Sequence, residues 1–169
     1  MRVVNPSDSS VQVSRDQKPA VALSAQSLIA SPFQVVDSRQ PLNITVNGRP
    51  LKGLSVPKNV LVTLVLDNEL AAAPRVIIEP QLRGKNLRAE LNIYNLRPGC
   101  ETADIKLANG ASVFSQLALK GQAQRTINPV QATLITSCEQ SASLPLTLNR
   151  SRPVIATACS WSARARPHA

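Results

Sequence analysis

The sequence predicts an all-β protein of two tandem small antiparallel β-sandwich domains joined by a short linker. Apolar and polar residues alternate in many short runs, which is the pattern of half-buried strands. Two Asn-Gly pairs, Asn47-Gly48 and Asn109-Gly110, stand between such runs and predict tight hairpins. Thirteen prolines spread along 169 residues interrupt the chain too often for long helices.

The first half of the chain contains short apolar runs separated by turn residues. Pro6 and the polar residues behind it end the first run, and Asn47-Gly48 follows a run that ends at Val46. The run VLVTLVL is apolar at nearly every position, which predicts a central strand covered on both faces. We expect the strand at 33–36 to be half-buried. The predicted strands are 2–5, 11–13, 21–23, 33–36, 42–46, 51–54 and 60–66.

The second half repeats this order of runs and turns. Asn95 follows an apolar run as Asn5 does, at a distance of 90 residues, and Leu42 and Val130 are 88 residues apart. Two similar offsets in strand context favour duplication of one module. Residues 121–128 form a polar lead-in to the strand that starts at Val130. The predicted strands are 91–94, 103–107, 113–114, 117–119, 130–134, 144–148 and 154–158.

Four segments follow from this repeat. We predict an N-terminal β-sandwich domain at 1–67, a C-terminal one at 89–161, and a disordered basic tail at 162–169. Residues 68–88 connect the domains as a semi-ordered linker, within which Arg75–Ile78 is a candidate short strand.

Positive charge is concentrated in the second half of the chain. Residues 1–82 carry eight basic and six acidic side chains, whereas residues 83–169 carry eleven and four. Such a surface favours anionic partners, with a merely solvated basic face as the alternative. The candidate partner- or polysaccharide-binding residues are Arg83, Lys85, Arg88, Arg125, Asn128, Arg150 and Arg152. For Asn128, which precedes a proline, turn formation is the stronger interpretation.

The sequence lacks the residues that several classes of function require. The four aromatic side chains cannot form a long stacking platform, so we predict no nucleic-acid partner. The single histidine, His168, is the penultimate residue, and no catalytic triad, phosphate-binding loop or paired carboxylate site can be assembled, so no enzyme is predicted. No apolar run is long enough to span a membrane.

The three cysteines, Cys100, Cys138 and Cys159, all lie in the second half. Their spacing does not match a metal site, and no metal or other cofactor is predicted. Cys100 follows a predicted strand and a Pro-Gly turn, and Cys138 ends another strand, so we predict a disulfide between them. Three buried free cysteines are the alternative.

Four segments of the sequence resemble a known family. The segments LNIYNL, ADIKLANG and GQAQRTINPVQATL (91–96, 103–110 and 121–134) resemble, in this order, the second domain of the periplasmic alginate O-acetylation protein AlgF. The segment RVVNPSDSSVQV (2–13) resembles the start of that family's first domain. The three cysteines depart from what we expect of the family.

The resemblance implies two β-sandwich domains and a non-catalytic accessory role in O-acetylation of an exopolysaccharide. The implied polymer is alginate, with acetylated cellulose as another possibility, and the implied partners are a membrane O-acyltransferase and SGNH-type acetyltransferases. The implied location is the periplasm. Because MRVVNPSDSS has no apolar signal core, we expect the signal peptide to lie outside this sequence. The alternative function is a carbohydrate-binding module that holds the anionic polymer.

Overall fold

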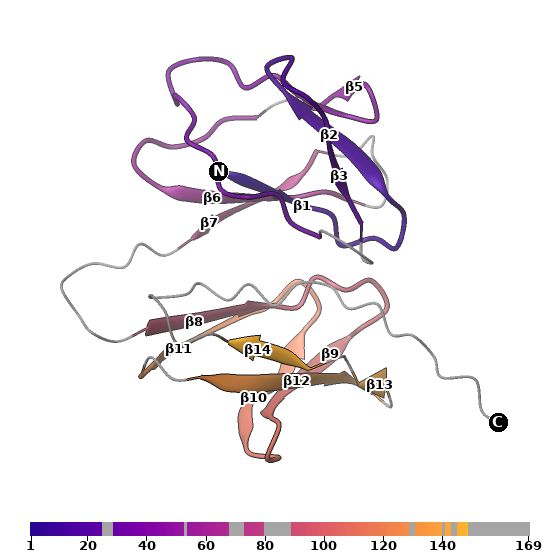
Figure 1. The fold of residues 1–169 in the computed structure, drawn as a ribbon, viewed down its shortest axis with the longest axis vertical. Helices are drawn as coiled ribbons and strands as arrows, with labels where there is room; N and C mark the ends of the chain where they lie inside the picture. Colours follow the sequence, from indigo (N-terminus) through magenta and orange to yellow (C-terminus); the bar gives the residue numbers. More distant parts are fainter. Residues whose placement is uncertain are drawn as a thin grey trace. The chain divides into compact units, whose positions relative to one another are not determined.

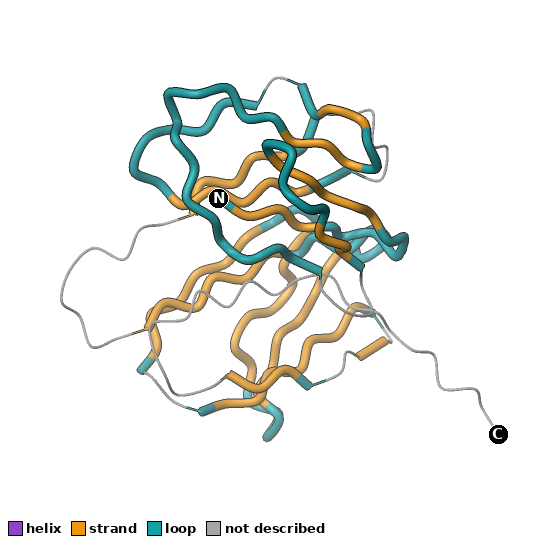
Figure 2. The backbone as a smooth tube through the Cα atoms, turned by 45° about the horizontal axis from the view of Figure 1, so that its top comes forward, coloured by secondary structure: helices purple, strands orange, loops and turns teal. Residues whose placement is uncertain are grey.

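The chain is all-β, as predicted, in the computed structural model shown in Figures 1 and 2. The structure describes residues 1–24, 29–52, 54–67, 73–79, 89–128, 131–139, 141–142 and 145–148. Every regular element among these residues is a strand. None of the described residues belongs to a helix of the length and hydropathy needed to cross a membrane.

The chain divides into two compact units, Met1–Gln81 and Leu82–Ala169. The first unit continues past Asp67, where the sequence predicted its end, because β7 (Arg75–Glu79) is a strand of its sheet. Part of the predicted linker 68–88 is therefore a full sheet element. The candidate strand within it is confirmed and is one residue longer than predicted.

Two sheets form the first unit (Figure 1). One has the order β1-β6-β7, in which β1 and β6 are parallel and β6 is central, as its continuous apolar run predicted. The other has the order β3-β2-β4-β5 and is antiparallel. The remaining strands are β1 (Arg2–Val4), β2 (Val11–Arg15), β3 (Val21–Leu23), β4 (Ile44–Val46), β5 (Arg49–Pro50) and β6 (Leu61–Val65).

The core of the first unit lies between its two sheets. Val3, Val62 and Leu64 contribute from one sheet, and alternate residues of β2, β3 and β4 contribute from the other. Alternation places these side chains on one face of each strand, so two thin sheets can enclose a shared apolar layer. The buried members on the second sheet are Val11, Val13, Leu23, Ile44 and Val46.

Two sheets also form the second unit. The smaller one pairs β8 with β11 along six residues of each strand, and the larger one has the order β10-β9-β12-β13, with β14 also paired to β12. Their core joins Leu91 and Ile93 of β8 to Ile105 and Leu134 of the larger sheet. The strands are β8 (Ala89–Tyr94), β9 (Thr102–Leu107), β10 (Ser112–Ala118), β11 (Gln122–Ile127), β12 (Ala132–Cys138), β13 (Ser141–Ala142) and β14 (Leu146–Leu148).

A buried asparagine organises each unit in the same way. The side-chain amide of Asn5 donates to the backbone carbonyls of Ser9 and Leu23, at 2.7 and 3.0 Å. The amide of Asn95 donates to the carbonyls of Cys100 and Leu117, at 2.9 and 3.0 Å. In the first unit, Ser9 precedes β2 and Leu23 ends its partner strand β3. In the second, Cys100 precedes β9 and Leu117 lies near the end of its partner strand β10. The two units therefore share a hydrogen-bonding arrangement at Asn5 and Asn95.

Both Asn-Gly pairs form hairpins, as predicted, but through different turns. Asn47 and Gly48 have φ values of 49° and 77°, which is the two-residue type I′ geometry. Because this turn is so short, the return strand β5 begins directly after Gly48 and not at residue 51. At the second pair only Gly110 has positive φ, 90°, and a longer loop joins β9 to β10.

The predicted strand at 33–36 is wrong. Residues 29–34 instead run beside β1, with backbone hydrogen bonds from Asn5 to Ile29 and from Ser31 to Val3. Pro32 has no N–H to continue a ladder, and only one isolated bridge, Val4 with Ala30, is formed. Phe33 and Val35 are 40% and 96% exposed, whereas Val36 is partly buried against the core.

Two expectations for the second unit are revised. The polar lead-in at 121–128 contains β11, an edge strand whose exposed positions accept polar side chains. The runs 113–114 and 117–119 belong largely to the single strand β10, which has an irregular register between Phe114 and Leu117. In a regular strand, residues three positions apart point to opposite faces. The irregularity lets both Phe114 and Leu117 pack against the same core. The predicted strand 154–158 and the tail 162–169 lie outside the described residues.

Candidate binding sites

Most of the predicted cationic site lies beyond the described part of the chain. Arg83, Lys85, Arg88, Arg150 and Arg152 all lie outside the described residues, and only Arg125 and Asn128 remain. The described strands and loops of the second unit carry as many acidic as basic residues. Its basic residues there are Arg97, Lys106, Lys120 and Arg125, against Glu90, Glu101, Asp104 and Glu139. The positive excess of the second half therefore resides in the residues that the structure does not describe.

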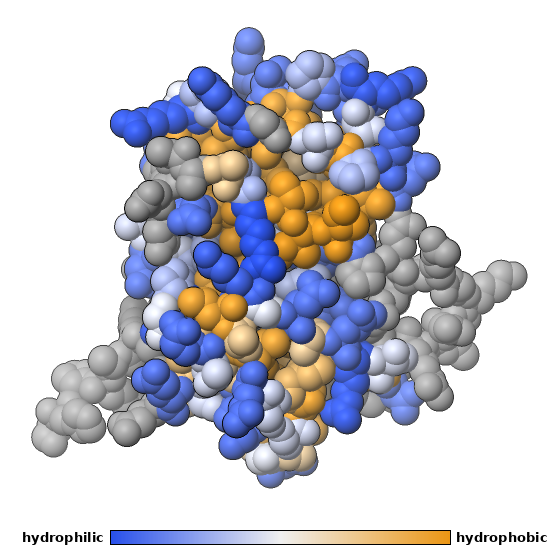
Figure 3. Space-filling view, turned by 180° about the vertical axis from the view of Figure 1, so that it is seen from behind, coloured by the Kyte–Doolittle hydropathy of each residue, from blue (hydrophilic) through white to orange (hydrophobic). Residues whose placement is uncertain are grey.

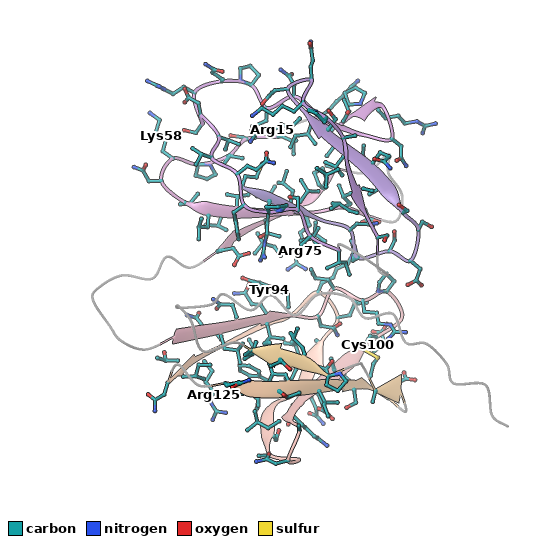
Figure 4. All side chains as sticks on the ribbon, viewed as in Figure 1. Arg15, Lys58, Arg75, Tyr94, Cys100 and Arg125 are labelled. Atoms are coloured by element: carbon teal, nitrogen blue, oxygen red, sulfur yellow. A yellow bond between two sulfur atoms is a disulfide. The ribbon has the colours of Figure 1, made fainter. Side chains whose placement is uncertain are left out.

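Arg125 lies on β11, opposite Leu91 of β8 (Figure 4). The strand exposes its side chain, and Nη1 donates to the carbonyl oxygen of Val113 on β10 at 3.3 Å. This contact links the two sheets of the unit, so the guanidinium has a structural partner as well as an exposed surface. Asn128 is exposed immediately after β11.

The predicted disulfide is confirmed. Cys100 and Cys138 are bonded, with their Cα atoms 5.7 Å apart (Figure 4). Cys100 precedes β9, and Cys138 is paired in register with Ala103 of that strand, so the bond joins neighbouring parts of one sheet. Cys159 lies outside the described residues.

A cavity that the sequence did not indicate opens in the first unit. It has a volume of about 40 Å³ and lies at the end of β2, between the two sheets. Its wall is mainly apolar, while Arg15, Lys18, Ser31 and Gln34 supply polar groups. The apolar lining residues are Met1, Val3, Val13, Pro19, Val21 and Ile44.

Arg15, labelled in Figure 4, is one of the charged residues that line this cavity. Its side chain is only 12% exposed, and Nη1 donates to the carbonyl of Val35 at 3.2 Å. Nε lies 3.2 Å from Oδ2 of Asp16, which makes an ion pair, but the donor and acceptor are not aligned as a hydrogen bond. The buried Nε–H therefore keeps an unsatisfied donor, which is costly for a desolvated group.

A tight turn brings Lys18 to the same cavity. Asp16 and Gln17 both have positive φ, 50° and 60°, and the Lys18 N–H donates to the Arg15 carbonyl at 2.9 Å. Consecutive left-handed residues that are not glycine are uncommon and need support from their surroundings. Burial, followed by repulsion from Arg15 and Arg2, lowers the pKa of the Met1 α-amino group. The cavity is thus locally electropositive.

A second, largely buried polar group spans the sheet β1-β6-β7. Arg2 donates to Oε1 of Glu79 at 2.7 Å and to the hydroxyl of Thr63 at 2.9 Å, and Thr63 donates to the same carboxylate oxygen. The Glu79 side chain is fully buried. Since Arg2 neutralises it and also lies over the Phe33 ring, 4.5 Å from the centroid, this cluster holds strands together.

Exposed large apolar side chains are more numerous in the described part of the first unit than in that of the second. They are Phe33, Val35, Val76 and Ile78, whereas the second unit exposes Leu146. Figure 3 shows apolar atoms at the surface of the first unit with hydrophilic side chains around them. No group of three potential metal ligands occurs among the residues that the structure describes.

The described residues thus form all-β units, with a small cationic cavity in the first unit and the exposed Arg125 on β11 of the second. Comparison with models of known protein families gives no match, and comparison with curated proteins gives none either.

The predicted and observed sites differ for a physical reason. The predicted site was chosen because its basic residues cluster in the second half of the sequence. Arg15 and Lys18, which line the observed cavity, lie in the first half, where the net charge is nearly neutral. Only the sheet packing around Val3, Val13 and Ile44 creates the cavity that they border. The one available sequence signal was the turn Arg15–Lys18, where two polar residues precede Lys18-Pro19.

Proposed function

We propose that this protein is a non-catalytic periplasmic accessory protein for O-acetylation of an exopolysaccharide, in which it bridges acetyltransferase components. The observation that carries the proposal is the ordered resemblance of 91–96, 103–110 and 121–134 to the alginate O-acetylation family. These segments correspond to β8, β9 and the β11–β12 region of the second unit. Alginate is the polymer of first choice, with acetylated cellulose second.

Two further observations support this assignment. The Cys100–Cys138 disulfide fits an oxidising compartment such as the periplasm. The basic residues of the second half fit an acidic partner protein or a polyuronate, since steering and counterion release favour polyanions. An accessory protein that works beside separate acetyltransferases needs no catalytic residues of its own.

Deletion of the gene tests the pathway. The acetyl content of the exopolysaccharide, measured by proton NMR of the purified polymer, should fall to background while the amount of polymer is retained. Complementation with the native gene should restore it. An unchanged acetyl content in the deletion strain would contradict the proposal.

Capture of the pathway's acetyltransferases by the tagged chain tests the adaptor role. We expect the triple variant Arg83→Glu, Lys85→Glu, Arg88→Glu to reduce co-purification by about tenfold, because charge reversal opposes an acidic partner. The matched control reverses three exposed cations of the first unit, Arg49, Lys52 and Lys58, and should retain capture. Equal loss in both variants would mean nonspecific charge attraction.

The second candidate is a carbohydrate-binding module for the anionic polymer. The same basic residues favour it, whereas the scarcity of aromatic side chains opposes it. Salt-sensitive binding of alginate oligomers by the purified chain, in the absence of partner proteins, would support this alternative over the adaptor.

A further inference from the structure

We propose that the cavity at the end of β2 binds a carboxylate group carried on a small molecular frame. The proposal concerns the first unit and does not depend on the proposed function. It rests on the shape of the cavity, the chemistry of its lining and the unsatisfied donor of Arg15.

The lining combines one apolar wall with two cations. Arg15 and Lys18 are its charged side chains, Met1 of the same lining carries the positively charged α-amino group, and no acidic side chain of the described residues belongs to the lining. The nearest acid, Asp16, contacts Arg15 but is 44% exposed and does not satisfy the buried Nε–H. A bound carboxylate would pair with the Arg15 guanidinium, because guanidinium and carboxylate form short charge-assisted contacts.

The cavity size selects a small ligand group. A bound water needs about 10 to 15 Å³ of such a volume, so about 40 Å³ has room for a few non-hydrogen atoms. A carboxylate with a short apolar part fits this space, with the apolar atoms against Val13, Val21 and Ile44. The oxygens then face Arg15 and Lys18, and Ser31 and Gln34 also line the cavity.

Two sources can supply this group. Acetate and propionate are free short carboxylates, whereas glucuronate carries its carboxylate on a sugar ring that would remain at the mouth. The cavity opens to solvent, so both can present the carboxylate to Arg15. Neutral molecules of the same shape lack the charge that the guanidinium requires.

NMR titration of the full-length chain tests the proposal. Sodium acetate should produce saturable shifts in the methyl groups of Val13, Val21 and Ile44 at constant ionic strength. Acetamide, which has nearly the same shape without the charge, and sodium chloride should not. A titration with glucuronate then distinguishes the two kinds of ligand. Shifts at the same methyl groups would show that the site also accepts uronic acids, and the absence of such shifts would restrict it to short carboxylates.

Variants connect the shifts to the two cations. Arg15→Gln should weaken acetate binding by about tenfold or more, as expected for a charge-assisted hydrogen bond. Lys18→Gln should weaken it by about threefold, because an exposed cation contributes less. The matched control Arg49→Gln removes an exposed cation of β5 that is not part of the lining and should change the affinity by less than about twofold.

The proposal is overturned if acetamide or chloride reproduces the acetate shifts, or if Arg15→Gln binds acetate as the native chain does. Should Arg15→Gln lose its dispersed spectrum, Lys18→Gln decides the question, because its side chain is exposed and its loss leaves the core intact. An unchanged affinity in that variant overturns the proposal as well.

Discussion

The two units share one arrangement and are reinforced differently. In each, a buried asparagine after the first strand holds the hairpin that follows through two carbonyl acceptors. The first unit then ties β1 to β7 by the Arg2–Glu79 ion pair, across Thr63 of β6. The second unit ties the approach to β9 to the end of β12 by the disulfide.

This difference shows which parts of a small sandwich are interchangeable. A unit of fewer than ninety residues buries a limited apolar area and benefits from an added constraint. An ion pair across three strands and a covalent bond between neighbouring parts of a sheet both supply such a constraint. The asparagine recurs in both units because its two donors meet carbonyls that the hairpin would otherwise leave buried and unpaired.

The largest expected effect on stability comes from removing the disulfide, which is present in the second unit and not in the first. Replacing both Cys100 and Cys138 by alanine should lower the free energy of unfolding of the second unit by about 4 kcal/mol, since the bond spans 38 residues of chain. The first unit contains no cysteine and should be unaffected. Urea denaturation monitored by NMR signals assigned to each unit measures this, and a loss in both units would contradict it.

The next effect should be similar in the two units. Asn5→Ala and Asn95→Ala should each cost their own unit about 2 to 3 kcal/mol, because each leaves two carbonyls without their donor. The loss should be slightly greater at Asn5, whose Oδ1 also accepts from Ser7, whereas Oδ1 of Asn95 has no such partner among the described residues.

The same urea measurement checks the asparagine variants. Asn43→Ala is the matched control at an exposed position and should change stability by less than about 0.5 kcal/mol. A large loss at only one of the two buried asparagines would disprove the shared arrangement.

The smallest effect compares the hairpin turns. Gly48→Ala and Gly110→Ala should each cost about 1 kcal/mol, because both glycines have positive φ, while a methyl group at either position would meet no other atom within 4 Å. Equal losses by thermal unfolding would show that the backbone conformation alone sets the cost. A clearly larger loss in one unit would point to a packing difference that the turns do not share.

Local patterns predicted much of each unit. The alternation at β2, β4 and β9, the apolar run of β6 and both Asn-Gly hairpins have causes within a few residues. The disulfide was predicted because both cysteines lie next to strands. The prediction of a strand at 33–36 was wrong because these apolar residues follow Pro32, which has no backbone N–H to donate to a neighbouring strand. Apolar residues alone do not reveal that missing donor.

The amino-acid sequence by itself determined the all-β class and the positions of most strands, because these depend on alternation and turn chemistry. The tertiary structure decided that β7 completes the first sheet, that the polar segment β11 pairs with β8, and that Arg15 borders a cavity. These features depend on pairings between residues distant in sequence. A strand at a sheet edge can carry polar residues at its exposed positions, so its sequence need not show the apolar alternation that predicts a strand. The local sequence also does not show which distant strand it pairs with.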